Sequence, residues 1–172
     1  MVQEIRETGA RMLGIHHVAM ATTDLDATMR FYSETFDMRL LASGEWDDVP
    51  EYDAMVGLPK SAARFALLGS ANLALELFQY LTPAPGAAET DRPVNKPGIT
   101  HLGFAVADLD AEYERLKRAG VRFHAPPMTS SGDRPIRAVY GRDPEGNVFE
   151  LLEFGGETPF DYKPSSPAWQ RT

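Results

Sequence analysis

The chain has 172 residues, enough for one well-packed domain or for two small modules that share a core. It contains no cysteine, so disulfides, thiolate metal sites and cysteine nucleophiles are excluded, and only His, Asp or Glu could hold a metal. A formal net charge of −8 argues against a nucleic-acid partner, which needs clustered cations, and no segment reaches the ~20 apolar residues of a membrane span.

The first expected elements are an N-terminal extension, a strand and a helix. Residues 1–13 carry four charged side chains and lack the apolar core of a secretory signal, so we expect a cytoplasmic protein. His17–Thr22 is an apolar run of strand length, and Asp24 then stands where a helix N-cap belongs. Apolar residues recur after it at helical spacing, at Leu25, Met29, Tyr32 and Phe36.

Three strands and a linker are expected next. The strands are predicted at Arg39–Glu45, Ala62–Leu68 and Asn72–Tyr80, with a loop at Trp46–Lys60 between the first two. Residues 81–97 contain four prolines, which suit an extended linker.

A second series of elements follows the linker. It begins with a strand at His101–Ala107, an N-cap at Asp108 and a helix that Gly120 would end in a left-handed turn. Its remaining strands are predicted at Val121–His124, Arg137–Tyr140 and Asn147–Phe154. Residues 155–172 form a surface tail rich in proline and glycine.

The two series are copies of one unit. GIHHVAMATTDLDA at residues 14–27 and GITHLGFAVADLDA at residues 98–111 are identical at eight of fourteen positions without a gap. Self-similarity of this kind indicates a duplicated structural unit. We therefore predict an α+β fold made of two βαβββ modules, 14–80 and 98–154, within one domain over residues 14–154.

Each module offers one histidine and one acid to a possible common site. His17 and His101 hold the same position in their first strands, so their imidazoles would converge if the modules packed around a pseudo-twofold axis. Glu76 and Glu150 each interrupt an apolar final strand, where an unpaired carboxylate is expensive to desolvate. Singly, each histidine could be structural, and Glu76 could pair with Arg64. Their joint occurrence in both modules instead favours one ion of Zn, Ni, Co, Fe or Mn bound by all four side chains.

Two other histidines are not expected to be ligands. His16 is adjacent to His17 and would point to the opposite face of the strand. His124 precedes two prolines in a predicted loop, and we interpret it as incidental.

These motifs resemble the vicinal-oxygen-chelate superfamily, which includes glyoxalase I, methylmalonyl-CoA epimerase, extradiol dioxygenases and the fosfomycin and bleomycin resistance proteins. The matching segments of the first module are His17-Val18, Asp24-Leu25-Asp26, Phe31-Tyr32 and Leu75-Glu76-Leu77. Those of the second are His101-Leu102, Asp108-Leu109-Asp110, Ala119-Gly120-Val121, Asp143-Pro144-Glu145-Gly146-Asn147 and Glu150-Leu151. The resemblance implies a cupped mixed sheet around the metal, a small-molecule substrate and a homodimer, in which the site can be shared between chains. The His, Glu, His, Glu set is most similar to glyoxalase I and the epimerases.

The predicted activity is that of a metal-dependent lyase or epimerase. The ion would polarise a carbonyl of a substrate with oxygens on neighbouring atoms and stabilise the enolate formed on proton removal. Glu76 or Glu150 would move the proton, and the sequence leaves the choice between them open.

Two other functions compete with this prediction. An extradiol-type dioxygenase would use iron on His17, His101 and Glu150, with Tyr140 as an acid, but Glu76 would then fill a position that oxygen needs. A non-catalytic drug-binding protein would need no metal, and four converging ligand-type side chains argue against it.

Residues for substrate recognition are expected in two loops and one strand. Arg134 or Arg137 could bind a carboxylate or phosphate from a loop over the site. Trp46 and Tyr52, in the loop found only in the first copy, could shape the mouth of the site, and Tyr140 could contact the substrate.

Overall fold

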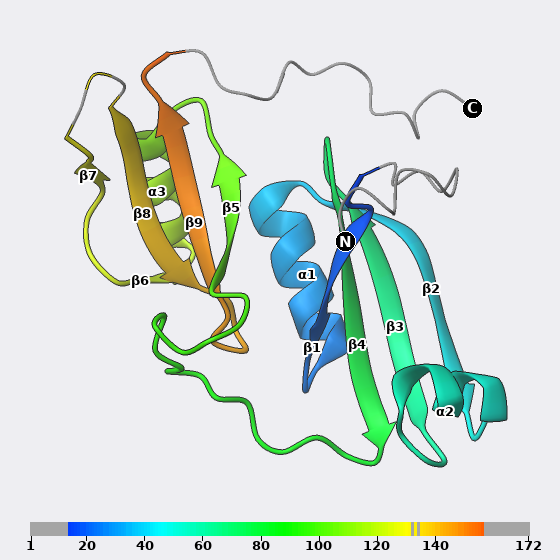
Figure 1. Ribbon diagram of the computed structural model, residues 1–172. Coiled ribbons are helices and arrows are strands. Elements are labelled where there is room, and N and C mark those ends of the chain that lie inside the picture. Colours follow the sequence, from blue (N-terminus) through cyan, green and yellow to red (C-terminus); the bar gives the residue numbers. More distant parts are fainter. Residues whose placement is uncertain (1–13, 132, 134, 157–172) are drawn as a thin grey trace, which may run out of the picture.

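Two mixed sheets, one from each module, form the frame of the molecule (Figure 1). The structure is a computed structural model that describes residues 14–131, 133 and 135–156. The extension predicted at residues 1–13 and the tail from residue 157 onward lie outside these described residues, as does Arg134.

The first module runs through a strand, two helices and three further strands. Its elements are β1 (His17–Ala21), α1 (Leu25–Phe36), β2 (Arg39–Asp47), α2 (Pro50–Val56), β3 (Ala62–Gly69) and β4 (Ala74–Thr82). The strand order is β1-β4-β3-β2, in which β1 is parallel to β4 and the other pairs are antiparallel.

The second module repeats this plan. Its elements are β5 (His101–Ala105), α3 (Leu109–Arg118), β6 (Arg122–Phe123), β7 (Met128–Thr129), β8 (Ile136–Arg142) and β9 (Val148–Phe154). The order is β5-β9-β8-β6, β7 also pairs with β8, and β5 is parallel to β9. The predicted α+β fold of paired βαβββ modules is confirmed.

Both long helices begin at the predicted N-caps, and α3 ends just before the predicted glycine. Asp24 and Asp108 are N-caps whose side chains accept hydrogen bonds from the backbone N–H three residues on, at 3.0 and 2.9 Å. Gly120, with φ +88°, follows α3 in the left-handed region, and the next N–H, of Val121, donates to the carbonyl of Leu116 at 3.0 Å.

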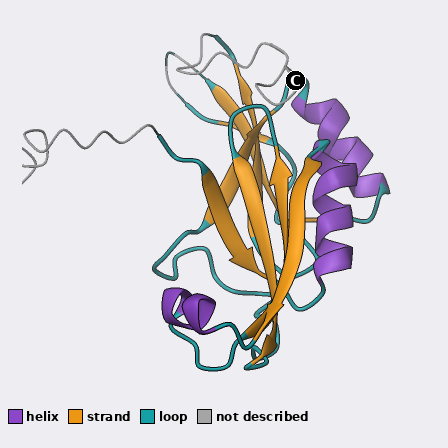
Figure 2. Cartoon of the chain, turned by 90° about the vertical axis from the view of Figure 1, so that its right-hand side faces the viewer, coloured by secondary structure: helices purple, strands orange, loops and turns teal. Residues whose placement is uncertain are grey.

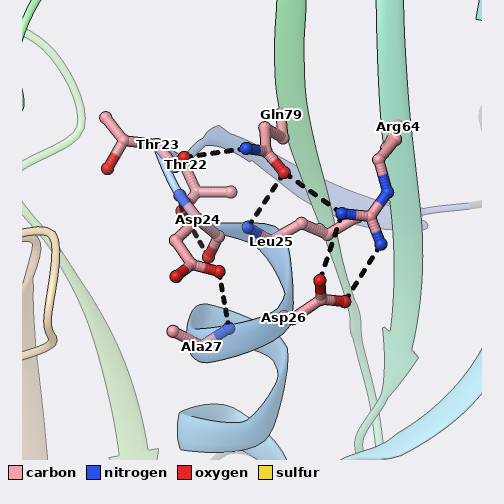
Figure 3. A network of polar contacts seen from close by, with 8 residues as sticks. All are labelled: Thr22, Thr23, Asp24, Leu25, Asp26, Ala27, Arg64 and Gln79. Atoms are coloured by element: carbon pink, nitrogen blue, oxygen red, sulfur yellow. Dashed lines mark hydrogen bonds and ion pairs between the residues drawn. The ribbon is translucent and has the colours of Figure 1, made fainter.

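A clamp of polar side chains ties α1 to its sheet (Figure 3). The guanidinium of Arg64 on β3 donates to both carboxylate oxygens of Asp26 at 3.0 and 3.1 Å. Gln79 on β4 accepts from the N–H of Leu25 and donates to the carbonyl of Thr23. Arg64 thus pairs with Asp26 on the helix side of the sheet. The alternative ion pair between Arg64 and Glu76 is not formed.

Helix α2 lies inside the segment that the sequence predicts to be a loop. Pro50 occupies its first turn, where no N–H is needed, and Gly57 ends it with φ +71°. Asp53 holds the segment to β3, because its carboxylate accepts from the N–H groups of Lys60 and Ser61. Pro50 and Gly57 were the sequence signals for the two ends of this helix. Seven residues are too few for a helical periodicity to be recognised.

Helix α1 is shared between the two modules. It buries Leu25, Thr28 and Tyr32, and the ring of Phe36 stacks on Phe104 of β5 with centroids 3.8 Å apart. Figure 1 shows α1 between β5 and β1, and Figure 2 shows both long helices on one side of the strands. The hydrophobic cores of the two modules therefore meet at α1.

A carboxylate of the second module also binds the start of α1. Glu145 accepts hydrogen bonds from Thr22 Oγ1, from the backbone and side chain of Thr23, and from the N–H of Asp24, at 2.8–3.3 Å. A negative charge at a helix N-terminus is favourable, so this contact stabilises both α1 and the packing of the modules. None of the helices within the described ranges is long and apolar enough to cross a bilayer.

Candidate metal centre

In the first module, strand alternation places Glu76 and His17 on the same sheet face. Leu75 and Leu77 of β4 are buried toward α1, so Glu76 between them projects from the other face. In the parallel register of β1 and β4, Ala19 lies opposite Glu76, which brings His17 to the same face. The Nε2 atom of His17 lies 3.2 Å from Oε2 of Glu76.

The second module builds the same pair. Phe149 and Leu151 are buried toward α3, and Glu150 projects from the opposite face. His101 Nε2 lies 3.2 Å from Glu150 Oε2. Within residues 14–131, 133 and 135–156, neither Glu76 nor Glu150 has another hydrogen bond or ion pair.

The residue before each histidine supports its ring. Nδ1 of His17 lies 2.9 Å from Nδ1 of His16, so one of the two nitrogens donates to the other. Nδ1 of His101 lies 2.9 Å from Oγ1 of Thr100, the equivalent position. A partner at Nδ1 orients an imidazole and leaves Nε2 for a ligand. His16 precedes β1, so strand alternation does not hold for it, and the expectation that it points away from His17 was wrong.

The two pairs do not meet within one chain. Among the described residues no group of three or more His, Asp or Glu side chains is close enough together to hold an ion. The reason is the position of α1, which packs against the faces of both sheets opposite to the pairs. The predicted convergence of four side chains is therefore wrong for a single chain, which presents two separate two-donor pairs.

The surroundings of the two acids differ. Burial raises the pKa of Glu150, and the neighbouring His101 offsets part of that rise. Tyr140 of β8 lies opposite Glu150 in register, and its ring is 4.9 Å from that of His101. Burial and the charge of Glu150 raise the pKa of Tyr140. In the first module the residue opposite Glu76 is Leu67, which carries no polar group.

His124 also lies at this end of the second module. Its ring centroid is 6.2 Å from that of Tyr140, and burial, followed by the charge of Arg142, lowers its pKa. This position of His124 could not be predicted, because the segment between β6 and β7 has no periodicity that would indicate its direction.

The residues expected to bind substrate have separate positions. Trp46 is buried on the Glu76 face, where Tyr52 of α2 contacts it edge-on at 5.5 Å. Arg137, in contrast, lies on the helix side of its sheet, where it pairs with Asp110 at 2.8 Å and with Glu153 at 3.4 Å. Its contacts repeat those of the Arg64 clamp, so strand alternation turns it away from Glu150, and we leave it out of the proposed site.

Three aromatic residues that share the face of Glu76 were not among the predicted site residues, although alternation already placed Phe78 on that face. Phe78 and Tyr80 follow Glu76 at intervals of two along β4, and Phe65 of β3 lies opposite Phe78 in register. The alternation along β4 was the available signal, because it places every second residue after Glu76 on the same face.

The sequence of this chain matches one known family. A family model described as the Glyoxalase/Bleomycin resistance protein/Dioxygenase superfamily matches residues 14–151. The chain belongs to this superfamily.

The relatives with curated functions are enzymes of several kinds. A 2-epi-5-epi-valiolone epimerase from an Actinomyces species is 33% identical over 87% of this chain and 84% of its own length. An ethylmalonyl-CoA/methylmalonyl-CoA epimerase from Cereibacter sphaeroides is 28% identical over 81% of this chain and 98% of its own. A probable chloroplastic lactoylglutathione lyase from Arabidopsis thaliana is 27% identical over 88% of this chain, which spans 38% of that lyase.

Solved structures share the fold. A glyoxalase family protein from Bacillus cereus superposes with a TM-score of 0.76 at 23% identity, covering 86% of this chain and 98% of that one. The fosfomycin resistance protein FosX from Listeria monocytogenes, solved with Mn(II) and sulfate, gives a TM-score of 0.56 at 20% identity, covering 83% and 93%.

Proposed function

We propose that this protein is a divalent-metal-dependent epimerase that inverts a carbon next to a ketone in a hydroxylated substrate. The observation that carries the proposal is the pair of equivalent His–Glu contacts, His17–Glu76 and His101–Glu150, each at 3.2 Å on an exposed sheet face. The epimerase relative at 33% identity, which covers most of both chains, supports epimerisation over the other reactions of the superfamily.

The donor set fits an ion when two chains combine. Each pair supplies one imidazole and one carboxylate, half of a His₂Glu₂ set that suits Zn, Ni, Co, Fe or Mn. Since the two pairs of one chain lie on outward faces, the proposed site joins His17 and Glu76 of one protomer to the second-module pair of another, in a homodimer. Ile15 and Ile99, at equivalent positions just before the two histidines, are 78% and 69% exposed, which suits burial between protomers.

The bound ion would supply Lewis-acid stabilisation of the negative charge that develops on the substrate oxygen. The two carboxylates account for the stereochemistry. Inversion requires a proton to leave one face of a carbon and another to arrive at the opposite face. Glu76 and Glu150 come from different sheets, so a substrate held between the two sheet faces would meet one carboxylate on each side. A positioned acid or base of this kind is worth about 10²–10⁴ in rate.

Proton exchange tests the proposal directly. The protein, purified without chelator, is incubated with 2-epi-5-epi-valiolone in D₂O, and deuterium at the carbon next to the ketone is followed by NMR. We expect exchange together with inversion, loss of both after a chelator, and recovery with Mn²⁺ or Zn²⁺. Protein that contains no ion, gains no activity with one and catalyses no exchange would contradict the proposal.

Lactoylglutathione lyase activity is the second candidate, because several plant relatives bear that name at 23–27% identity. The chain spans only 38–44% of those proteins. Incubation with the hemithioacetal of methylglyoxal and glutathione separates the two, since only a lyase of this type would form the thioester.

A further inference from the structure

Five aromatic side chains form one continuous surface beside Glu76. We call this surface the aromatic wall, and it consists of Trp46, Tyr52, Phe65, Phe78 and Tyr80. Ring centroids of contacting members are 5.5–6.4 Å apart, the separation at which aromatic pairs attract each other. Phe65, Phe78 and Tyr80 are half-buried, so part of each residue remains exposed.

The wall is continuous with the proposed metal pair. Phe78 is two residues beyond Glu76 on β4 and lies opposite Phe65 of β3, and Ala21 of β1 lies opposite Phe78. A substrate whose oxygens were held beside Glu76 would therefore extend over these rings. On this face β3 contributes every second residue from Ala63 to Gly69, and β4 contributes every second residue from Ala74 to Tyr80. None of these residues is a lysine or an arginine, which does not suit a phosphate at this position.

Hydrogen bonds and close packing hold two members of the aromatic wall, Trp46 and Phe65, in place. The indole N–H of Trp46 donates to Oγ of Ser61 at 2.8 Å, and Ser61 Oγ donates to Asp53 of the α2 segment at 2.6 Å. The only hydrogen-bond donor of the Trp46 side chain is thus satisfied within the protein. Gly44 of β2 allows Phe65 to lie over the strand, because a Cβ at that position would stand 2.8 Å from the ring. Rings held in place before a ligand arrives lose little conformational entropy on binding.

The second module has no such surface. Positions equivalent to Phe78 and Phe65, counted from the register with the module's glutamate, are Leu152 and Ala138. Its segment between β6 and β8 contains the short strand β7 and, within the described residues, no helix. The two halves of the proposed site therefore differ, and only the first offers an aromatic platform.

Two hydroxyl groups complete the chemistry of the wall. Within the described part of the chain, the hydroxyls of Tyr52 and Tyr80 have no hydrogen-bond partner. A surface that offers ring faces with free hydroxyls beside them matches a carbon ring that has C–H groups on its face and hydroxyls at its edge. We infer that the aromatic wall is the subsite for the ring of a cyclic, polyhydroxylated ketone, and that it makes the enzyme prefer cyclic over open-chain substrates. This inference rests on the proposed function, because Glu76 and the ion anchor the ketone end.

Binding of two small hydroxyketones tests the inference without catalysis. The probes are scyllo-inosose, which is cyclic, and dihydroxyacetone, which is open-chain, and both present a carbonyl beside a hydroxyl. A Trp169→Phe background leaves Trp46 as the only tryptophan, and its emission is titrated in Zn²⁺-loaded protein, since Zn²⁺ does not quench fluorescence. We expect scyllo-inosose to bind at least about tenfold more tightly than dihydroxyacetone.

Phe78→Leu is the informative variant, because it gives the first module the side chain that the second has at Leu152. We expect it to raise the Kd for scyllo-inosose about tenfold and the Kd for dihydroxyacetone less than about twofold. Leu152→Ala is the matched control at the equivalent position, and it should change both constants by less than about twofold. Zn²⁺ stoichiometry and thermal unfolding confirm that each variant is folded and loaded.

Three results would overturn the inference: no preference for scyllo-inosose, equal changes for both probes in Phe78→Leu, or an equal effect of Leu152→Ala. The proposed function fails separately. Absence of metal-dependent proton exchange, with the preference for the cyclic probe intact and dependent on Phe78, would contradict the epimerase and leave the wall in place. Metal-dependent proton exchange without a preference for the cyclic probe would support the epimerase and contradict the aromatic wall as its subsite.

Discussion

The two modules share a framework and differ in the faces they expose. Both have a capping aspartate, an arginine clamp and a histidine beside a glutamate, each at the equivalent position. The first module has aromatic rings on the same sheet face as its glutamate, whereas the second places Tyr140 and His124 near its own. Features required to build the unit are therefore present in both copies, while the open sheet faces differ. This difference matches the proposed division between a binding face and a face for polar chemistry.

Replacing either glutamate gives the largest expected effect. Glu76→Gln and Glu150→Gln should each lower kcat by about 10²–10⁴, because in the proposed reaction each carboxylate serves one face of the reacting carbon and also helps to hold the ion. Proton exchange and bound metal are measured together. If one variant kept full exchange, the modules would not contribute equally, and a single-base reaction would replace the proposed one.

Phe36→Ala tests the packing between the modules. The ring is sandwiched among Phe31, Phe104 and Phe149 from both modules, so its loss should lower the free energy of unfolding by about 3 kcal/mol. Chemical denaturation measures the change. Tyr52→Ala, at a residue 44% exposed, is the control and should cost less than about 1 kcal/mol. Equal effects would mean that α1 does not join the two cores.

Glu145→Gln tests the polar tether between the modules. The substitution removes the charge that accepts hydrogen bonds from Thr22, Thr23 and Asp24. We expect a loss of about 1.5–3 kcal/mol by denaturation, as for hydrogen bonds to charged groups. Asp91→Asn, which weakens only an exposed contact with Arg122 at 3.7 Å, should have almost no effect. A Glu145 variant as stable as the wild type would show that the tether is dispensable.

The two arginine clamps should contribute equally to the acid dependence of stability. Arg64 and Arg137 lower the pKa values of Asp26 and Asp110. A lowered carboxyl pKa adds stability that is present above the ordinary aspartate pKa and is lost as pH falls through the lowered value. Arg64→Met and Arg137→Met should therefore each flatten the fall in stability at acid pH by a similar, small amount. A change confined to one variant would show that the two clamps are not equivalent.

Local features of the fold could be predicted because each depends on a few neighbouring residues. The caps at Asp24 and Asp108 are examples. Strand β4 begins two residues later than predicted, because Ser70 and Leu73 form a hydrogen-bonded turn before it. The sequence indicated one histidine and one glutamate in each module as candidate ligands, and the parallel pairing of β1 with β4 and of β5 with β9 brings each pair to 3.2 Å.

The packing between modules could not be predicted in this way. Periodicity indicates which face of its own sheet a residue occupies, and it does not say on which side of α1 the second sheet lies. Phe31 carried part of the missing information, because it adds apolar surface to α1 beside the predicted stripe of Leu25, Met29, Tyr32 and Phe36. Phe31 and Phe36 both pack against the cores of the two modules. Their contacts with β5 and β9 turn the two His–Glu pairs outward.

The claim that one ion is bound between two chains has a direct test. Glu76→Gln and Glu150→Gln chains, each inactive alone, are differently tagged, unfolded together in equal amounts and refolded. In a shared-site dimer the mixed species has one site with both substitutions and one intact site. Since about half of the dimers are mixed, about a quarter of wild-type activity should return, all of it in the fraction that carries both tags. Mixed dimers that form but stay inactive would contradict a shared site and the epimerase built on it.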